Sequence, residues 1–395
     1  MTRFSIHVKR YTVLLACAAC QSSLLCGYEI SMSLVSNFIK QDLDMKAVDK
    51  ACFVDTIQLV SVLTMVPSGA LSDWIGRRPL LIIVGMSAFV GYFVMTIASS
   101  VSMLIIGRML SLLGVGLALP TTPLYIAEIA TPKVRGFLNC TPEVLSIFGS
   151  LLALLNMEIY SSVPHHISWR VIIGFGMVPS GILAIRMFWL PESPQWLIHR
   201  GRIAETSMAL SKTASNGSLA SARLNELKLA AKIPVDSTAN IVVMSEETDP
   251  LALYQFFRNP QQPRFKVIVS VLYLSIMQQI CGVDVIISNF VKGVIPMKNQ
   301  IWSRVLVALV KLLITLVPML GVDKIGRKPL LLVSFVLITI ASAVLGFSHL
   351  EDGGTRFFLF VLIAGYALGL GPITAVYSTE VLPFKTRAQV LGLGM

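Results

Sequence analysis

Residues 73–81 read Asp-Trp-Ile-Gly-Arg-Arg-Pro-Leu-Leu, and residues 323–331 read Asp-Lys-Ile-Gly-Arg-Lys-Pro-Leu-Leu. Each stretch is a short basic break between two long apolar runs. A second group recurs at nearly the same offset, because Tyr125, Glu128 and Arg135 return as Tyr377, Glu380 and Arg387. An internal repeat flanked by apolar spans is typical of membrane transporters built from two similar halves. We therefore predict a duplicated helical membrane protein.

The composition agrees with a membrane protein. Of the 395 residues, 55% are hydrophobic and 13% are charged, whereas a soluble domain carries about 25% charged residues. The apolar runs are about 20 residues long, enough to cross a bilayer as helices. They lack the alternation of a membrane β-barrel. There is no phosphate-binding G-x-x-x-x-G-K-[ST] loop and no nucleophile–base set, so we expect neither an ATP-driven pump nor an enzyme.

The apolar runs predict ten spans, at residues 11–37, 51–71, 80–98, 102–125, 137–160, 168–190, 265–291, 300–322, 330–348 and 357–382. We expect a six-helix bundle over residues 1–190, a linker with short surface helices over 191–264, and an incomplete second bundle over 265–395. Six plus six spans would complete the duplication. The chain stops at Met395, where an eleventh span should begin, so we expect a C-terminally truncated second half.

The basic residues predict an orientation in the bilayer. The net charge is +11, but lysine and arginine lie in loops and at the flanks of apolar runs, mostly on one face. The positive-inside rule puts the N-terminus, both repeats and the central loop in the cytosol. We therefore expect the basic residues to serve orientation in the lipid bilayer and not binding of nucleic acid. We expect the protein to lie in the plasma membrane rather than in an endomembrane.

No metal or cofactor site is apparent. The six cysteines, at positions 17, 20, 26, 52, 140 and 281, lie in or beside apolar runs and indicate no disulfide framework. His165 and His166 adjoin without further ligands. We expect no cofactor.

Ordered motifs resemble the sugar porter family of the major facilitator superfamily. They are Gly69, Asp73, Gly76, Arg77 and Arg78; Pro123, Tyr125, Glu128, Arg135 and Gly136; the run 191–197; and Gln278, Gln279 and Gly282. Within that family, Gly27-Tyr28-Glu29, Glu143 and Lys311 are most similar to the class III facilitative hexose transporters. The resemblance implies an all-α major facilitator fold of two parallel-repeat bundles. It also implies transport of a hexose, polyol or disaccharide by alternating access, either facilitated or proton-coupled.

Glu29 lies midway along the first span, where a carboxylate is costly and needs a partner or a proton. The resemblance implies Arg108 as that partner. Burial raises the pKa of an acid and a nearby arginine lowers it, so alternating access can load and release a proton there. The alternative is a permanent structural ion pair.

The resemblance places Gln278 and Gln279 where family members bind sugar hydroxyls, and amides suit this because each donates and accepts. The alternative is a contact that holds helices together. The same resemblance places Glu143 and Lys311 at the cavity.

The sequence departs from the family at several positions. Asp284 replaces an asparagine, and Thr374-Ala375 replaces a proline–tryptophan pair. We expect Asp284 and Lys311 to pair across spans seven and eight; the alternative is that each faces cavity water. Such a cavity would suit a polyol, a disaccharide or a charged solute as well as glucose.

The repeats predict a cytosolic gate whose charges bridge the halves in similar proteins. Its residues are Asp73, Arg77, Arg78, Glu128, Arg135, Asp323, Arg327, Glu380 and Arg387, with Glu128 matched to Arg135 and Glu380 to Arg387. The alternative is that the basic loops only orient the protein.

Two other functions stay open. Asp284 and Lys311 would also fit a carrier of another small polar or charged solute. The early end of the chain would fit a non-transporting sensor, a partner of full-length carriers or an inactive isoform.

Overall fold

The computed structural model describes residues 10–43, 45–214, 216–231, 233–234, 240–242, 263–283, 286, 300–347 and 352–394. Within these ranges all regular elements are helices. Among the described residues, nine helical stretches are long and apolar enough to cross a membrane. These helices agree with the predicted all-α multi-pass membrane protein, since a helix pairs its own backbone N–H and C=O groups inside a bilayer.

The first half contains six of these spans. Its elements are α1 (Arg10–Met32), η1 (Ser33–Val35), α2 (Ser36–Asp42), α3 (Ala47–Ile75), α4 (Arg77–Thr96), α5 (Val101–Ile129), η2 (Pro132–Val134), α6 (Arg135–Asn139), α7 (Thr141–Ile159), η3 (Tyr160–Ser162), α8 (His165–Phe175) and α9 (Met177–Trp189). The short helices α8 and α9 together form one span.

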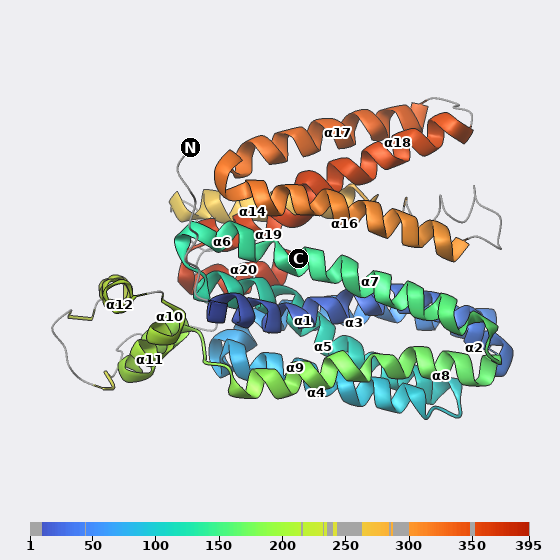
Figure 1. The fold of residues 1–395 in the computed structure, drawn as a ribbon, viewed down its shortest axis with the longest axis horizontal. Coiled ribbons are helices and arrows are strands. Elements are labelled where there is room, and N and C mark those ends of the chain that lie inside the picture. The colour runs from blue at the N-terminus through green and yellow to red at the C-terminus, as the bar shows by residue number, and fades with distance from the viewer. Residues whose placement is uncertain are drawn as a thin grey trace.

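Three short helices follow the first half. They are α10 (Pro194–His199), α11 (Ile203–Thr213) and α12 (Gly217–Ala230). They share a small apolar core that includes Ile198, Ile203 and Ile233. In Figure 1 they lie beyond one end of the long helices.

The second half is described from α14 onward. Its elements are α14 (Pro263–Ile280), α16 (Gln300–Ile325), α17 (Arg327–Phe347), α18 (Asp352–Gly365), the π-helix η5 (Tyr366–Leu370), α19 (Gly371–Val381) and α20 (Phe384–Gly394). The span expected over 265–291 is described through residue 283 and at Ile286. α18, η5 and α19 form one continuous span.

The two halves form separate groups of helices that meet along shared seams (Figure 1). α7 of the first half packs against α16 of the second, and α3 packs against α20. The largest core cluster lies inside the first half, around Tyr28, Tyr92 and Trp169. A movement of one half against the other would therefore slide these seams and leave that core intact.

Glycines bring α1 and α7 close together. A Cβ added at Gly27 would lie 1.7 Å from the carbonyl oxygen of Ser146, and one at Gly149 would lie 2.0 Å from that of Leu24. Only a residue without a Cβ allows this backbone approach. The close contact holds the helix that carries Glu29 against the helix that carries Glu143.

The repeated motif forms the same turn in both halves. Gly76 joins α3 to α4 with φ 111°, and Gly326 joins α16 to α17 with φ 93°. Residues with a Cβ rarely adopt this backbone conformation, so the glycine of each repeat lets one helix end and the next begin at once. The duplication seen in the sequence is therefore a duplication of structure.

Candidate functional site

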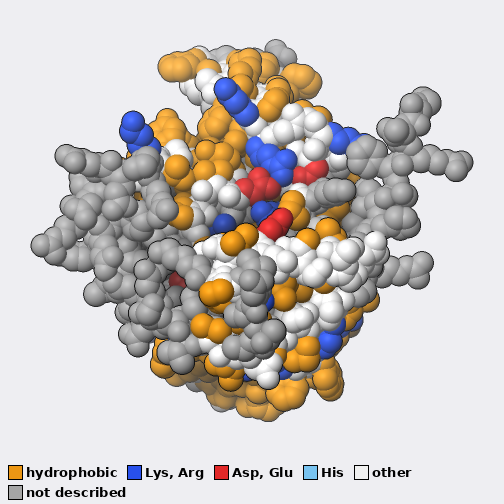
Figure 2. All heavy atoms as spheres, turned by 90° about the vertical axis from the view of Figure 1, so that its left-hand side faces the viewer, with side chains coloured by type: hydrophobic (Ala, Val, Ile, Leu, Met, Phe, Trp, Pro, Cys, Tyr) orange, Lys and Arg blue, Asp and Glu red, His pale blue; other side chains and the backbone are white. Residues whose placement is uncertain are grey.

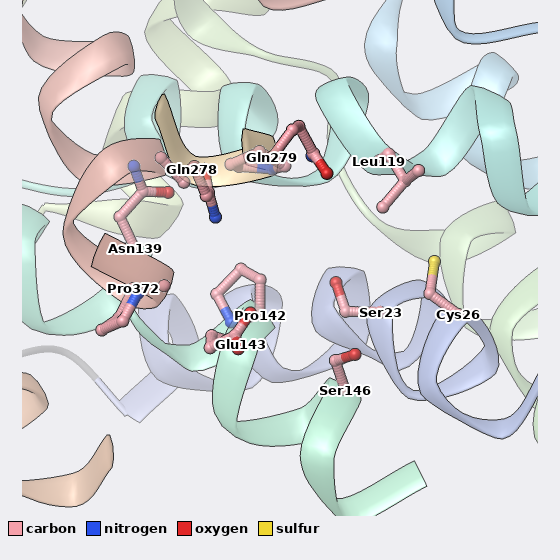
Figure 3. Close-up of a pocket in the computed structure, with 13 residues that line it drawn as sticks. Ser23, Cys26, Leu119, Asn139, Pro142, Glu143, Ser146, Gln278, Gln279 and Pro372 are labelled. Carbon is pink, nitrogen blue, oxygen red and sulfur yellow. The ribbon is translucent and has the colours of Figure 1, made fainter. Parts of the chain in front are cut away.

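A cavity of about 180 Å³ lies between the two halves, as Figure 3 shows. The first half lines it with Ser23, Cys26, Leu119, Pro123, Asn139, Pro142, Glu143 and Ser146. The second half lines it with Gln278, Gln279, Gly371, Pro372 and Ala375. Glu143 is the one charged residue in this lining, as far as the described residues go. The cavity thus combines amides, hydroxyls and a carboxylate from both halves.

Amide side chains supply much of the polar lining. Gln278 donates from Nε2 to the hydroxyl of Tyr366 at 3.3 Å, while Gln279 lies beside it in the lining. Asn139 donates from Nδ2 to Oγ1 of Thr379 at 2.5 Å. Its buried Oδ1 has no hydrogen-bond partner among the described residues. Asn139 therefore offers a hydrogen-bond acceptor. The sequence analysis did not select this residue, although it is a lone amide beside the Arg135-Gly136 motif.

A charged pair crosses the cavity region from one half to the other. Nζ of Lys311 on α16 lies 3.5 Å from Oε1 of Glu143 on α7, and both side chains are partly exposed. Nζ also lies 5.1 Å from the centroid of the Tyr366 ring. Asp284, the partner expected for Lys311, lies outside the described residues, so that pairing stays a prediction. The structure adds Glu143 as a partner that the sequence analysis did not consider.

Glu29 and Arg108 come together as expected. Nη1 of Arg108 lies 3.6 Å from Oε2 of Glu29, and both side chains are buried. The guanidinium also lies 4.2 Å from the Phe53 ring centroid. Neither carboxylate oxygen of Glu29 has a hydrogen bond to a described residue. Cys26 lines the cavity one helical turn before Glu29, so this buried pair lies next to the cavity but outside its lining.

The first repeat forms a buried Asp–Arg–Glu cluster. Arg77 Nη2 lies 2.9 Å from Asp73 Oδ1 and 3.1 Å from Glu128 Oε1. Glu128 also accepts a hydrogen bond from the hydroxyl of Ser193. The arginine therefore joins the ends of α3 and α5 inside the first half.

The second repeat forms the same cluster. Arg327 Nη2 lies 2.9 Å from Asp323 Oδ1 and 2.7 Å from Glu380 Oε1. These side chains are about a quarter exposed, whereas Arg77 and Glu128 are fully buried. The repeat thus places one arginine between two acids in each half.

The expected pairs of Glu128 with Arg135 and of Glu380 with Arg387 do not form. Each acid pairs with the arginine of its own repeat, which begins a neighbouring helix. Arg135 and Arg387 each follow the end of the helix that carries the acid. Arg387 instead donates to Oε1 of Gln195 at 3.3 Å. Arg135 has Glu380 of the other half as an electrostatic neighbour. Arg387 likewise has Glu128 of the other half as an electrostatic neighbour, so both arginines face the opposite half.

Direct contacts close the cavity between the halves at this end. The N–H of Phe137 donates to Oδ2 of Asp323 at 2.9 Å, and the Asn139–Thr379 bond also crosses the seam. His199 of α10 stacks on Phe384 of α20 with ring centroids 4.0 Å apart. Figure 2 looks onto this end and shows basic and acidic side chains gathered near its centre.

Helix ends at this face are capped by charged side chains. Glu192 accepts from the backbone N–H groups of Arg77 and Arg78, at the positive end of α4. Burial raises the pKa of the Glu192 carboxyl, and hydrogen bonds from the backbone N–H groups of Ser193 and Arg78 oppose that shift. Arg78 donates to the carbonyl of Met187 at 3.0 Å, so it caps α9 and does not join the Asp–Arg–Glu cluster.

The short helices attach to the first half through Arg223 of α12. Its guanidinium donates to the carbonyls of Glu128, Ile129 and Ala130 at 3.1, 3.3 and 2.9 Å. Burial lowers the pKa of Arg223 to about 10. A cation at the C-terminal end of α5 is favoured by the helix dipole.

Comparisons with known proteins agree with this arrangement. The sequence model of a family described as "Sugar (and other) transporter" matches residues 14–395. The chain belongs to this family. It is therefore a membrane transporter and not an enzyme, and the expectation of a sugar-type transporter is confirmed. All six cysteines are free thiols in the structure.

Named relatives cover nearly the whole chain. The chain is 32% identical to "Putative polyol transporter 1" of Arabidopsis thaliana, over 98% of this chain and 80% of that protein. It is 27% identical to the "Arabinose-proton symporter" of Bacillus subtilis (strain 168), over 98% and 82%. A structure of the major facilitator proton:xylose symporter XylE bound to 6-bromo-6-deoxy-D-glucose aligns with TM-score 0.82 at 21% identity, over 98% and 86%. The major facilitator fold is confirmed.

Proposed function

We propose that this transporter carries an uncharged polyol or a related sugar. The observation that supports this most is the cavity between the halves, lined by Gln278, Gln279 and the acceptor oxygen of Asn139. Ala375 lies in the lining, and no aromatic side chain lines it among the described residues. Amides bind hydroxyls without needing a ring to stack on. Relatives named as polyol transporters support the same solute class.

Alternating access follows from the seams between the halves. At the end that carries the repeats, the Phe137–Asp323 and Asn139–Thr379 bonds hold the halves together. Opening this end requires those bonds to break, while the Asp–Arg–Glu cluster inside each half can stay intact. The transporter would then alternate between two arrangements of the halves. Binding and release of the solute would shift the populations of these two arrangements.

We further propose that Glu29 couples transport to a proton. The carboxylate is buried beside Arg108 and has no hydrogen bond to a described residue. Protonation would remove the ion pair between α1 and α5, so the two states of Glu29 favour different helix positions. Relatives named as arabinose–proton and galactose–proton symporters support coupling. A fixed structural pair is the alternative outcome.

The proposed orientation puts the repeats and the short helices α10–α12 in the cytosol, with the plasma membrane as the location. The basic side chains at the face in Figure 2 support this, because lysine and arginine are retained on the cytosolic side.

Uptake into proteoliposomes tests the proposal. The whole chain is reconstituted and offered labelled sorbitol, with and without an inward proton gradient. We expect the gradient to raise uptake by the wild type and to have no effect on a Glu29→Gln variant, because glutamine cannot carry the proton. Glu205→Gln is the matched control, since Glu205 forms an exposed pair with Arg202 at the start of α11, away from the cavity lining.

The outcomes separate the parts of the proposal. Uptake that ignores the gradient in both the wild type and Glu29→Gln would remove proton coupling and keep facilitated transport. An absence of uptake for sorbitol and for hexoses would overturn the transport of this solute class and favour a non-transporting sensor.

A further inference from the structure

The charged residue of the described cavity lining pairs with a residue from the opposite half. Glu143 is the charged residue of the described lining, and Lys311 reaches it from α16 with 3.5 Å between Nζ and Oε1. We propose that this pair is a charge filter, which admits uncharged polyhydroxylated solutes and excludes both sugar acids and amino sugars. This inference rests on the proposed function and names the solute class more narrowly.

The faces of α16 show that Lys311 is directed inward. Val305 and Leu312 belong to a cluster with residues of α7. Leu309, Leu313 and Leu320 are exposed on another face of the helix, where the bilayer would lie. Lys311 is on neither of these faces, since its Nζ contacts Glu143 of α7 and the ring of Tyr366.

The pair is connected to the amides of the cavity. The ring of Tyr366 lies 5.1 Å from Nζ of Lys311, and its hydroxyl accepts from Nε2 of Gln278 at 3.3 Å. Tyr366 begins the π-helix η5, and a π-helix turn inside a span often marks a functional site. A solute bound at Gln278 would therefore lie close to Lys311 and Glu143, because Tyr366 contacts both Gln278 and Lys311.

The geometry leaves both charges accessible to a solute. The side chains of Lys311 and Glu143 keep 17% and 26% of their surface exposed, and their separation is longer than a tight ion pair. Such a partly wet bridge holds the two halves together weakly. Hydroxyl groups can replace it, because the ammonium donates to a hydroxyl oxygen and the carboxylate accepts from a hydroxyl hydrogen.

The opposite charges act against any solute that carries a net charge. A carboxylate attracted to Lys311 has to approach the carboxylate of Glu143, and an ammonium attracted to Glu143 has to approach Lys311. Placing like charges side by side in a partly buried interface is strongly unfavourable. A charged solute also loses its hydration without gaining a net counter-charge. A neutral polyol meets neither penalty.

Binding of three solutes with one skeleton tests the filter. D-sorbitol, D-gluconate and D-glucamine are all acyclic six-carbon compounds that are neutral, anionic and cationic at pH 7. Their affinities are measured by calorimetry on the detergent-solubilised whole chain. We expect the wild type to prefer sorbitol to both charged compounds by at least about tenfold.

Single variants should shift the preference in opposite directions. Glu143→Gln removes the negative charge of the pair, so the ratio of gluconate to glucamine affinity should rise at least about tenfold. Lys311→Gln leaves Glu143 unbalanced, so the same ratio should fall by a similar factor. The exchanged double variant, Glu143→Lys with Lys311→Glu, keeps a neutral pair and should keep the wild-type ratio. It also controls for folding, together with size-exclusion profiles.

The filter is overturned if both single variants change the three affinities by the same factor, because a purely structural bridge would do that. It is also overturned if the ratio moves in Asp284→Asn but not in Glu143→Gln. These readouts are affinity ratios, whereas the proposed function is tested by uptake. If sorbitol uptake is intact and the ratio of gluconate to glucamine affinity does not change in the single variants, the filter is wrong but the proposed transport stands. If the ratio shifts as expected but no uptake occurs, the proposed transport is wrong but the filter stands.

Discussion

Charged side chains inside this protein fall into two groups with different exposure. Arg77, Glu128, Glu29 and Arg108 are almost fully buried, whereas Glu143 and its partner lysine are partly wet. A buried charge that loses its partner stays desolvated and uncompensated, while a wet charge can turn to water. Substitutions in the first group should therefore affect stability, and those in the second should affect solute selection.

Replacing Glu128 with glutamine should destabilise the protein strongly. Arg77 would lose one of its two ion pairs among the described residues, and we expect a loss of about 3–5 kcal/mol. Thermal unfolding of the detergent-solubilised chain measures this. The control is Glu205→Gln, which removes an exposed pair with Arg202 and should change stability by less than about 1 kcal/mol. Equal effects of the two variants would contradict the expectation.

At the scale of elements, the two repeat turns have the same backbone but different surroundings. A Cβ at Gly76 would lie 2.5 Å from Oε2 of Glu192, the residue that caps α4. A Cβ at Gly326 would meet nothing nearer than 3.8 Å, at Pro329. The first turn therefore combines a left-handed conformation with a close contact, and the second has the conformation alone.

Replacing each glycine with alanine should separate these two effects. Gly326→Ala should cost about 1–2 kcal/mol, from the left-handed conformation. Gly76→Ala should cost more, because it also displaces the Glu192 cap. Gly217→Ala is the control, since nothing lies within 4 Å of the added Cβ. Melting temperatures of the three variants measure the order of their stability losses. If Gly326→Ala loses as much stability as Gly76→Ala, or more, the role of the Glu192 cap is refuted.

At the scale of the whole molecule, the repeat has different consequences in the two halves. Asp73 and Asp323 are equivalent residues, and each pairs with the arginine of its own repeat at 2.9 Å. Asp323 also accepts from the N–H of Phe137 in the other half. Only the second of these acids therefore joins the halves, as far as the described contacts go.

Asp323→Ala should open the end that carries the repeats. Cys140 is buried near Asp323 at this seam, so we expect its modification by a soluble thiol reagent to accelerate by roughly fivefold or more. Asp73→Ala removes the equivalent ion pair inside one half and should leave the rate close to wild type. Mass spectrometry of the native cysteines measures it, with buried Cys20 as the internal reference. Equal acceleration at Cys20 would indicate general loosening and not gate opening.

Hydropathy and the repeated motif were enough to predict the helices and the duplicated fold, because the bilayer requires helical spans of a set length and the turn at Gly76 and Gly326 requires glycine. The family followed from the ordered motifs along the chain. They could not predict the partners of charges. Glu128 and Glu380 pair with the arginines of their own repeats, and Glu143 pairs with Lys311. Those partners depend on which helix faces pack together across the seams, and side-chain spacing along one chain carries no record of that packing.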